Sequence, residues 1–289
     1  MVQYNPKDWF GLIFKFHKSD TFRKLFWVML SIALYAFAVV YLELEVLKIE
    51  PKSVTVMHTL LGFVISLLLV FRTNTAYDRW WEGRKQWGAL VNVSRNFAFK
   101  IISFIPESDA ALRDRLLNAD ACYADVLRGH LRDVSRETLL SRVSADLTIN
   151  VNALHVPNII AQNMQKDAMT AYKNHEISQS AYLAMLEDIN KFTDICGACE
   201  RIKKTPIPYT YNIFIKKFIF VYIVSMPIAF VSDFHYWTIL ATVFTFYTLA
   251  SLELIAETIE DPFGLDSDDL PTDDLAITIK NNVTEIRNQ

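Results

Sequence analysis

The chain has 289 residues, of which 52% are hydrophobic and 21% charged, and its formal net charge is -3. This composition is too apolar for a protein that is mostly solvated. The small net charge gives no electrostatic basis for binding nucleic acid. No nucleophile elbow, phosphate-binding loop or zinc-protease motif is present, so the chain is not expected to be an enzyme.

Four apolar segments have about the length that a membrane span requires. They cover residues 25–42, 54–71, 214–231 and 237–256. Each is close to the ~20 residues that cross ~30 Å of hydrocarbon. They form two hairpins with short links, and the long polar region between the hairpins lacks strand-like alternation. We therefore predict an all-α membrane protein with four transmembrane helices and a helical cytosolic domain.

This pattern divides the chain into five parts. They are an N-terminal cytosolic or interfacial segment (1–24), a first transmembrane hairpin (25–71), a helical cytosolic domain (72–208), a second hairpin (209–256) and an acidic tail (257–289). Basic residues gather on one side of the spans, which the positive-inside rule assigns to the cytoplasm. We expect a multi-pass protein in the lipid bilayer of the inner (plasma) membrane, with both termini cytoplasmic.

The second apolar segment is unusually polar for a simple anchor. Thr59, Phe63, Leu67 and Phe71 are four residues apart and share one helical face. Ser66 lies on the adjacent face. Polar groups at membrane depth normally face a bundle interior or water, and rings of Phe and Leu can gate a pore by dewetting. We interpret this helix as pore-lining; the alternative is ordinary helix packing.

Carboxylates crowd the segment that follows the last span. Asp261, Asp266 and Asp269 stand among further acidic residues, and Gly264 and Pro271 interrupt any helix there. Turned backbone with several carboxylates suits a hard cation such as calcium. The alternative is a solvated acidic tail.

The remaining metal and redox candidates are weak. Cys196 and Cys199 form an isolated pair without a second cysteine pair, so they favour packing over zinc. The six histidines do not cluster in the sequence. His58, near one end of the second span, fits a hydrogen-bonded packing role better than a pH sensor.

Four stretches of the chain resemble the bestrophin family in its bacterial branch. They are residues 71–88, 199–208, 233–236 and 256–264. Together with the two-hairpin layout, the resemblance covers about residues 1 to 275. It implies a homopentamer whose second spans line one central pore through a narrow apolar neck. Phe63, Leu67 and Phe71 would form this neck, with Thr59 and Ser66 at its flank.

The resemblance also implies a calcium clasp after the fourth span. Asp261, Asp266 and Asp269 match its side-chain positions, and a backbone carbonyl near Phe10 would complete it. Bound Ca²⁺ would then be structural or regulatory. Ser267 departs from the acidic run of the animal proteins, so binding is an expectation to be tested.

A second constriction of the family falls by position near Ser180 and Ala181. These residues are small, so an aperture there would be wide or weakly selective. Glu43, Glu45 and Glu50 in the outer link would concentrate cations at the mouth. We expect a channel for monovalent ions, favouring cations over the alternative, a chloride channel. A secondary transporter and a membrane scaffold remain open, and unitary currents would separate the three classes.

Overall fold

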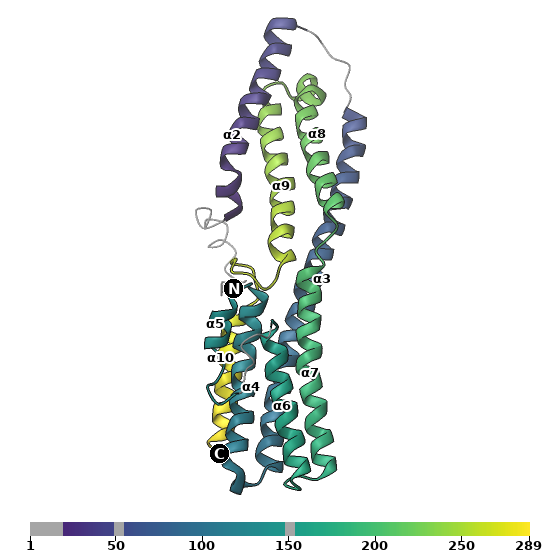
Figure 1. Ribbon diagram of the computed structural model, residues 1–289. Helices are drawn as coiled ribbons and strands as arrows, with labels where there is room; N and C mark the ends of the chain where they lie inside the picture. Colours follow the sequence, from purple (N-terminus) through teal and green to yellow (C-terminus); the bar gives the residue numbers. More distant parts are fainter. Residues whose placement is uncertain (1–19, 49–54, 148–153) are drawn as a thin grey trace. The chain divides into compact units, whose positions relative to one another are not determined.

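A computed structural model describes residues 20–48, 55–147 and 154–289 of the chain (Figure 1). Within these ranges the protein is helical and contains no strand. Four helices are long and apolar enough to cross a membrane: Thr21–Leu47, Thr55–Phe104, Tyr209–Phe234 and Trp237–Glu260. The prediction of an all-α protein with four membrane helices is confirmed.

The chain divides into two compact units. The membrane unit comprises residues 2–79 and 206–260, and the polar unit comprises residues 80–205 and 261–289. Helix α3 (Thr55–Phe104) is continuous over 50 residues and contributes to both units.

The membrane unit contains α2 (Asp20–Tyr41), a short π-helical turn (Leu42–Leu47), the first half of α3, α8 (Tyr209–Phe234) and α9 (Trp237–Glu260). Helix α2 packs along α9 and α8, and α8 packs along α9. Ile65 and Leu69 of α3 join Ile219 and Ile223 of α8 in a buried apolar cluster. Close van der Waals packing of these branched side chains holds α3 against α8.

Two close contacts between α3 and α8 explain why small or polar residues occur in an apolar helix. A Cβ on Gly62 would lie only 2.7 Å from the Tyr222 hydroxyl oxygen, so glycine permits the close approach. His58 is buried, lies 3.1 Å from the Tyr222 carbonyl oxygen through Nε2, and packs on the Tyr222 ring. The packing role expected for His58 agrees with these contacts.

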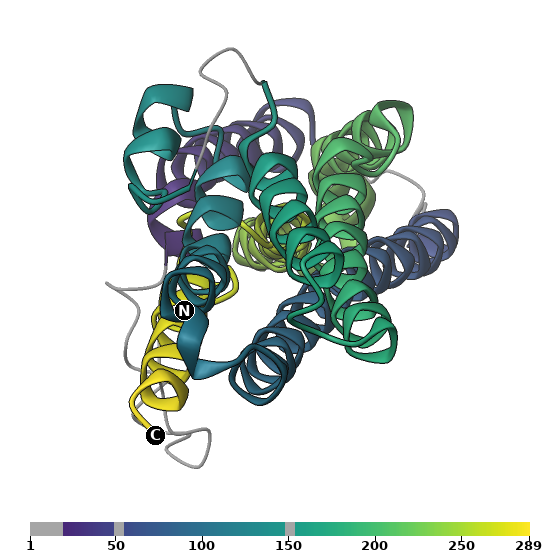
Figure 2. The ribbon, with the colours of Figure 1, turned by 60° about the horizontal axis from the view of Figure 1, so that its bottom comes forward.

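The polar unit contains the second half of α3, a 3₁₀ turn (Glu107–Asp109), α4 (Ala110–Leu131), α5 (Arg136–Ser141), α6 (Val156–Lys173), α7 (Gln179–Lys204) and α10 (Thr272–Arg287). Figures 1 and 2 both show α10 beside α4 and α6 beside α7. The side chains of Asp109, Ser135, His155 and Ser178 cap helices by accepting hydrogen bonds from backbone N–H groups.

Large aromatic side chains form the core of the polar unit. Trp87 and Phe97 of α3 are buried with Tyr123 of α4 and Phe192 of α7. The Tyr123 hydroxyl donates to the Phe192 carbonyl oxygen at 2.9 Å, which satisfies its polar atom inside the core. The segment after the last span is therefore more than an acidic tail, because its helix α10 completes this bundle.

The cysteines take part in the same packing. Cys196 and Cys199 are free thiols and both are buried. Burial raises the pKa of each thiol to about 12. Neutral, buried thiols behave as small hydrophobic groups, as the sequence indicated.

Candidate functional site

The residues predicted to form the pore neck lie on a face of α3 that the membrane unit leaves uncovered. Phe63, Leu67 and Phe71 are 70%, 46% and 56% exposed. The Thr59 and Ser66 hydroxyls are also exposed, and they donate to the carbonyl oxygens of Thr55 and Gly62, each at 2.8 Å. These bonds occupy both hydroxyl protons, so the flank is less polar than its composition implies.

The opposite face of α3 is buried inside the membrane unit. Ile65, Leu69, Arg72 and Ala76 are all buried and recur at spacings of four, three and four residues. The apolar stripe therefore points away from the protomer core. Other apolar side chains of α3, such as Leu60, are equally exposed, so the pore-lining role of the stripe stays a prediction.

A buried ion pair fixes α3 just beyond this stripe. Arg72 is 1% exposed, and its Nη2 donates to Glu260 Oε2 at 2.6 Å. The other Glu260 oxygen accepts the backbone N–H of Ile207 at 2.6 Å, and Arg79 Nε donates to the Glu260 carbonyl oxygen at 3.1 Å. Glu260, the last residue of α9, thus joins α3 to the segment that precedes α8.

The predicted cytosolic aperture falls on the first turn of α7. Ala181 is 9% exposed and belongs to the core of the polar unit. Ser180 is exposed, and its hydroxyl lies 2.9 Å from that of the helix cap Ser178. Leu183, one turn further, is 53% exposed. The aperture at Ser180 and Ala181 stays a prediction; Ser180 is exposed, whereas Ala181 is packed in the core of the polar unit.

The acidic segment forms a turn between α9 and α10. Asp269 is buried; its Oδ2 accepts the Asp266 N–H at 2.7 Å, and its Oδ1 has no hydrogen-bond partner among the described residues. Burial, with the nearby carboxylates of Asp266 and Asp261, raises the pKa of Asp269 to about 6. An uncompensated buried carboxylate of this kind is what a cation would stabilise.

The predicted calcium ligands are only partly gathered. Asp261 is exposed and its Oδ1 accepts the Phe263 N–H at 3.4 Å. Phe10 lies outside the described residues. Among the residues described, Asp261, Asp266 and Asp269 do not bring three ligand atoms within 4.8 Å of one another.

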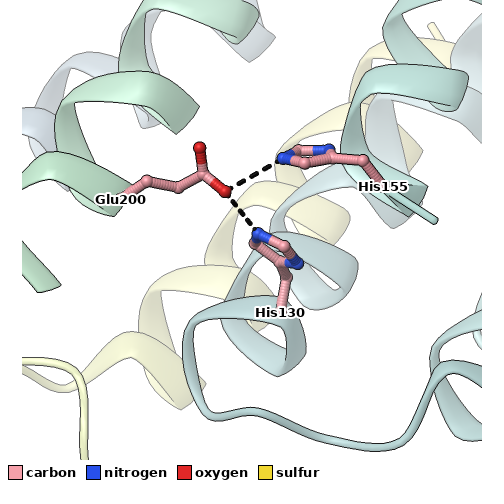
Figure 3. Close-up of side chains that lie close together, drawn as sticks. All are labelled: His130, His155 and Glu200. Carbon is pink, nitrogen blue, oxygen red and sulfur yellow. Dashed lines mark hydrogen bonds and ion pairs between the residues drawn. The ribbon is translucent and has the colours of Figure 1, made fainter. Parts of the chain in front are cut away.

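A second cluster in the polar unit escaped the sequence analysis. His130, His155 and Glu200 each place one potential ligand atom within 4.8 Å of the others, the one such trio among the described residues (Figure 3). The three come from the last turn of α4, the N-cap of α6 and the last turn of α7. They are far apart in the sequence and converge only when the helix ends pack, so no local spacing indicates a cluster.

Comparisons with known proteins agree with this architecture. The family described as Bacterial/Fungal Bestrophin protein matches residues 1–285. The voltage-dependent anion channel-forming protein alr2987 of Nostoc sp. (strain PCC 7120) is 32% identical over 287 residues, covering 97% of this chain and 92% of that protein. The voltage-dependent anion channel-forming protein YneE of Escherichia coli K12 is 28% identical and covers 100% of this chain and 95% of that protein.

The fold is also that of a solved structure. A crystal structure of a bacterial bestrophin homologue from Klebsiella pneumoniae has a TM-score of 0.83 at 24% identity, covering 92% of this chain and 99% of that chain. At this identity the likeness shows the fold alone. Because the family match spans nearly the whole sequence, the chain belongs to the bacterial and fungal bestrophins, a family of membrane ion channels and not of enzymes.

Proposed function

We propose that this bestrophin is a homopentameric channel that conducts monovalent anions. The preference for anions rests on the near full-length similarity to relatives named voltage-dependent anion channel-forming proteins. This favours the chloride alternative over the cation reading drawn from the outer link. The cation reading rests on Glu43, Glu45 and Glu50, and an acidic outer link raises the local cation concentration without deciding which ion passes the rest of the path.

The uncovered face of α3 supports the proposed pore. Five copies of the stripe Phe63, Leu67 and Phe71 around one axis would form successive apolar rings. Such rings admit ions only when the constriction is wetted, and they do not themselves choose the sign of the ion. Sign selection would then arise from charges and dipoles elsewhere along the path.

Reversal potentials in planar bilayers test the ion preference. Purified protein is placed in a potassium chloride gradient, and chloride is then replaced by gluconate on one side. Anion conduction predicts a reversal potential near the chloride equilibrium value and a large shift on replacement. A potential near the potassium value would establish the cation channel instead. Saturable flux without unitary steps would indicate a transporter, and silence would favour a scaffold.

A matched pair of variants tests the neck. Leu67→Ala should change unitary conductance or open probability, because it widens one apolar ring. Met57→Ala removes a similarly exposed apolar side chain (62% against 46%) about 80° around α3 from Leu67 and should change conduction less. Equal effects of the two variants would place the pore lining elsewhere. The pentamer is tested by measuring the protein mass of the solubilised particle after the mass of bound detergent is subtracted.

We also propose that Ca²⁺ binds the acidic turn, where it would be structural or regulatory. The buried, unpartnered oxygen of Asp269 fits a hard cation, with Asp261, Asp266 and a carbonyl near Phe10 as further ligands. Calorimetry of Ca²⁺ binding should give heat that Asp266→Ala abolishes, while Asp274→Ala on α10 should leave it intact. Absence of heat in the unmodified protein would remove calcium from the proposal.

The basic residues beside the spans support an orientation with both termini in the cytoplasm of a bacterial inner membrane. A fluorescent protein that folds only in the cytoplasm, fused to the C-terminus, should be bright. A dark fusion together with an active periplasmic reporter at the same position would reverse the topology.

A further inference from the structure

Three side chains in the polar unit already have the composition of an open metal site. His130, His155 and Glu200 point toward one another from three helix ends (Figure 3). Two imidazoles and one carboxylate are a ligand set that binds Zn²⁺ and leaves a fourth position for water. The three side chains are 22%, 30% and 20% exposed, so an ion could reach them from solvent.

The distances suit an ion after a small adjustment. Glu200 Oε1 lies 2.7 Å from His130 Nε2 and 3.0 Å from His155 Nε2. Tetrahedral bonds of about 2.0–2.1 Å would separate ligand atoms by roughly 3.3 Å. An ion therefore needs the side chains to move apart by a few tenths of an ångström. The second Glu200 oxygen points away from both imidazoles in Figure 3.

The contacts between Glu200 and the two imidazoles span the position that an ion would take. The Asn158 N–H donates to His155 Nδ1 at 3.2 Å, so neutral His155 carries its proton on Nε2 and donates it to Glu200. Coordination through Nε2 would move that proton to Nδ1 and break this cap. Asn158 is exposed, so water can replace the lost acceptor. Metal affinity should increase with pH for a separate reason, because a protonated imidazole must release a proton before it can coordinate an ion.

We propose that His130, His155 and Glu200 bind a divalent transition metal of the Zn²⁺ class. The bound ion ties the ends of α4, α6 and α7 together in the polar unit. The site is independent of the acidic turn, whose oxygen ligands suit calcium. Lys204 lies 3.4 Å from Glu200 Oε1 and is 70% exposed, so its charge opposes the ion but can swing into solvent.

Calorimetry with ZnCl₂ on the full-length, tag-free protein in detergent, stripped with EDTA, tests the site. We expect one ion per chain, with an affinity that rises with pH and with Lys204→Gln. Co²⁺ should give the visible absorption of a four-coordinate ion. His155→Asn is the sharpest variant, because asparagine retains a good helix cap but removes the imidazole. It should weaken binding at least about 100-fold, more than the loss of a residue that only supports a ligand.

His175→Asn is the matched control. His175 is exposed and has a φ of 59°, a conformation that asparagine tolerates, so folding and Zn²⁺ binding should both persist. Circular dichroism of every variant reports whether it is folded. Absence of Zn²⁺ binding by the folded unmodified protein would leave the trio as a hydrogen-bonded joint. Equal Zn²⁺ binding by His155→Asn and the unmodified protein would place the ion on other ligands.

Discussion

Glu260→Gln probes the contact that holds α3 at the level of its buried arginine. The substitution preserves the shape of the side chain and an oxygen that can accept the Ile207 N–H, now 2.6 Å from Glu260 Oε1. It removes the charge that faces Arg72 Nη2 at 2.6 Å. The experiment therefore isolates the electrostatic part of the contact.

Burial sets the size of the effect. Arg72 and Glu260 have side chains that are only 1% and 11% exposed. Arg72 Nε and Nη1 are buried without a hydrogen bond to any described residue, so Glu260 is the carboxylate that hydrogen-bonds this charge, with Glu253 as a more distant acidic neighbour. Removing one partner of a buried pair costs about 3–5 kcal/mol. At 2–4 °C per kcal/mol, the melting temperature should fall by roughly 6–20 °C.

Thermal melting followed by size-exclusion chromatography in detergent measures this loss. Glu82→Gln is the control, because Glu82 pairs with Lys85 at 2.6 Å where the two side chains are 32% and 55% exposed. Exposed pairs contribute only about 0–1 kcal/mol. Adding Arg72→Met to Glu260→Gln should recover part of the stability, since no buried charge then remains unpaired.

If Glu260→Gln melts within about 2 °C of Glu82→Gln, the Arg72 guanidinium is solvated or paired elsewhere. If the double variant is less stable than Glu260→Gln alone, the arginine stabilises the unit through contacts other than this carboxylate.

Two further predictions concern packing. Gly62→Ala should destabilise the membrane unit by about 1–3 kcal/mol, because its methyl group would meet the Tyr222 hydroxyl, and Tyr222→Phe should restore most of the loss in the same melting assay. A failure of Tyr222→Phe to rescue would show that other contacts limit the space. Cys196 and Cys199, with thiol pKa values of about 12, should be only about one ten-thousandth thiolate at pH 8 and should resist iodoacetamide until the protein is unfolded. Mass spectrometry checks this, and rapid labelling of the folded protein would contradict the burial.

The sequence predicted the membrane architecture because a membrane span has a strict length and composition. An apolar run near ~20 residues is hard to place elsewhere. It also indicated that the second span continues without a linker into a polar helix, and α3 does run unbroken from Thr55 to Phe104. What it described as an acidic tail ends in helix α10. Ala276, Ile279, Val283 and Ile286, at spacings of three and four residues, form the buried face that could have signalled it.

Contacts that depend on how helices meet could not be predicted. Arg72 and Glu260 are 188 positions apart, and each alone would read as a charge at a membrane interface. His130, His155 and Glu200 are brought together by the ends of three helices, and no local spacing records that. The burial of Ala181 could not be predicted either, because it depends on which face of α7 packs into the core of the polar unit.

The acidic turn packs against the second half of α3. Within the polar unit, the Phe263 ring and Leu270 approach Gly83 of α3 so closely that a Cβ there would lie 3.2 Å from each. Trp80 Nε1 donates to the Asp268 carbonyl oxygen at 2.9 Å. A cation bound in the turn would therefore act first on the part of α3 around Trp80 and Gly83.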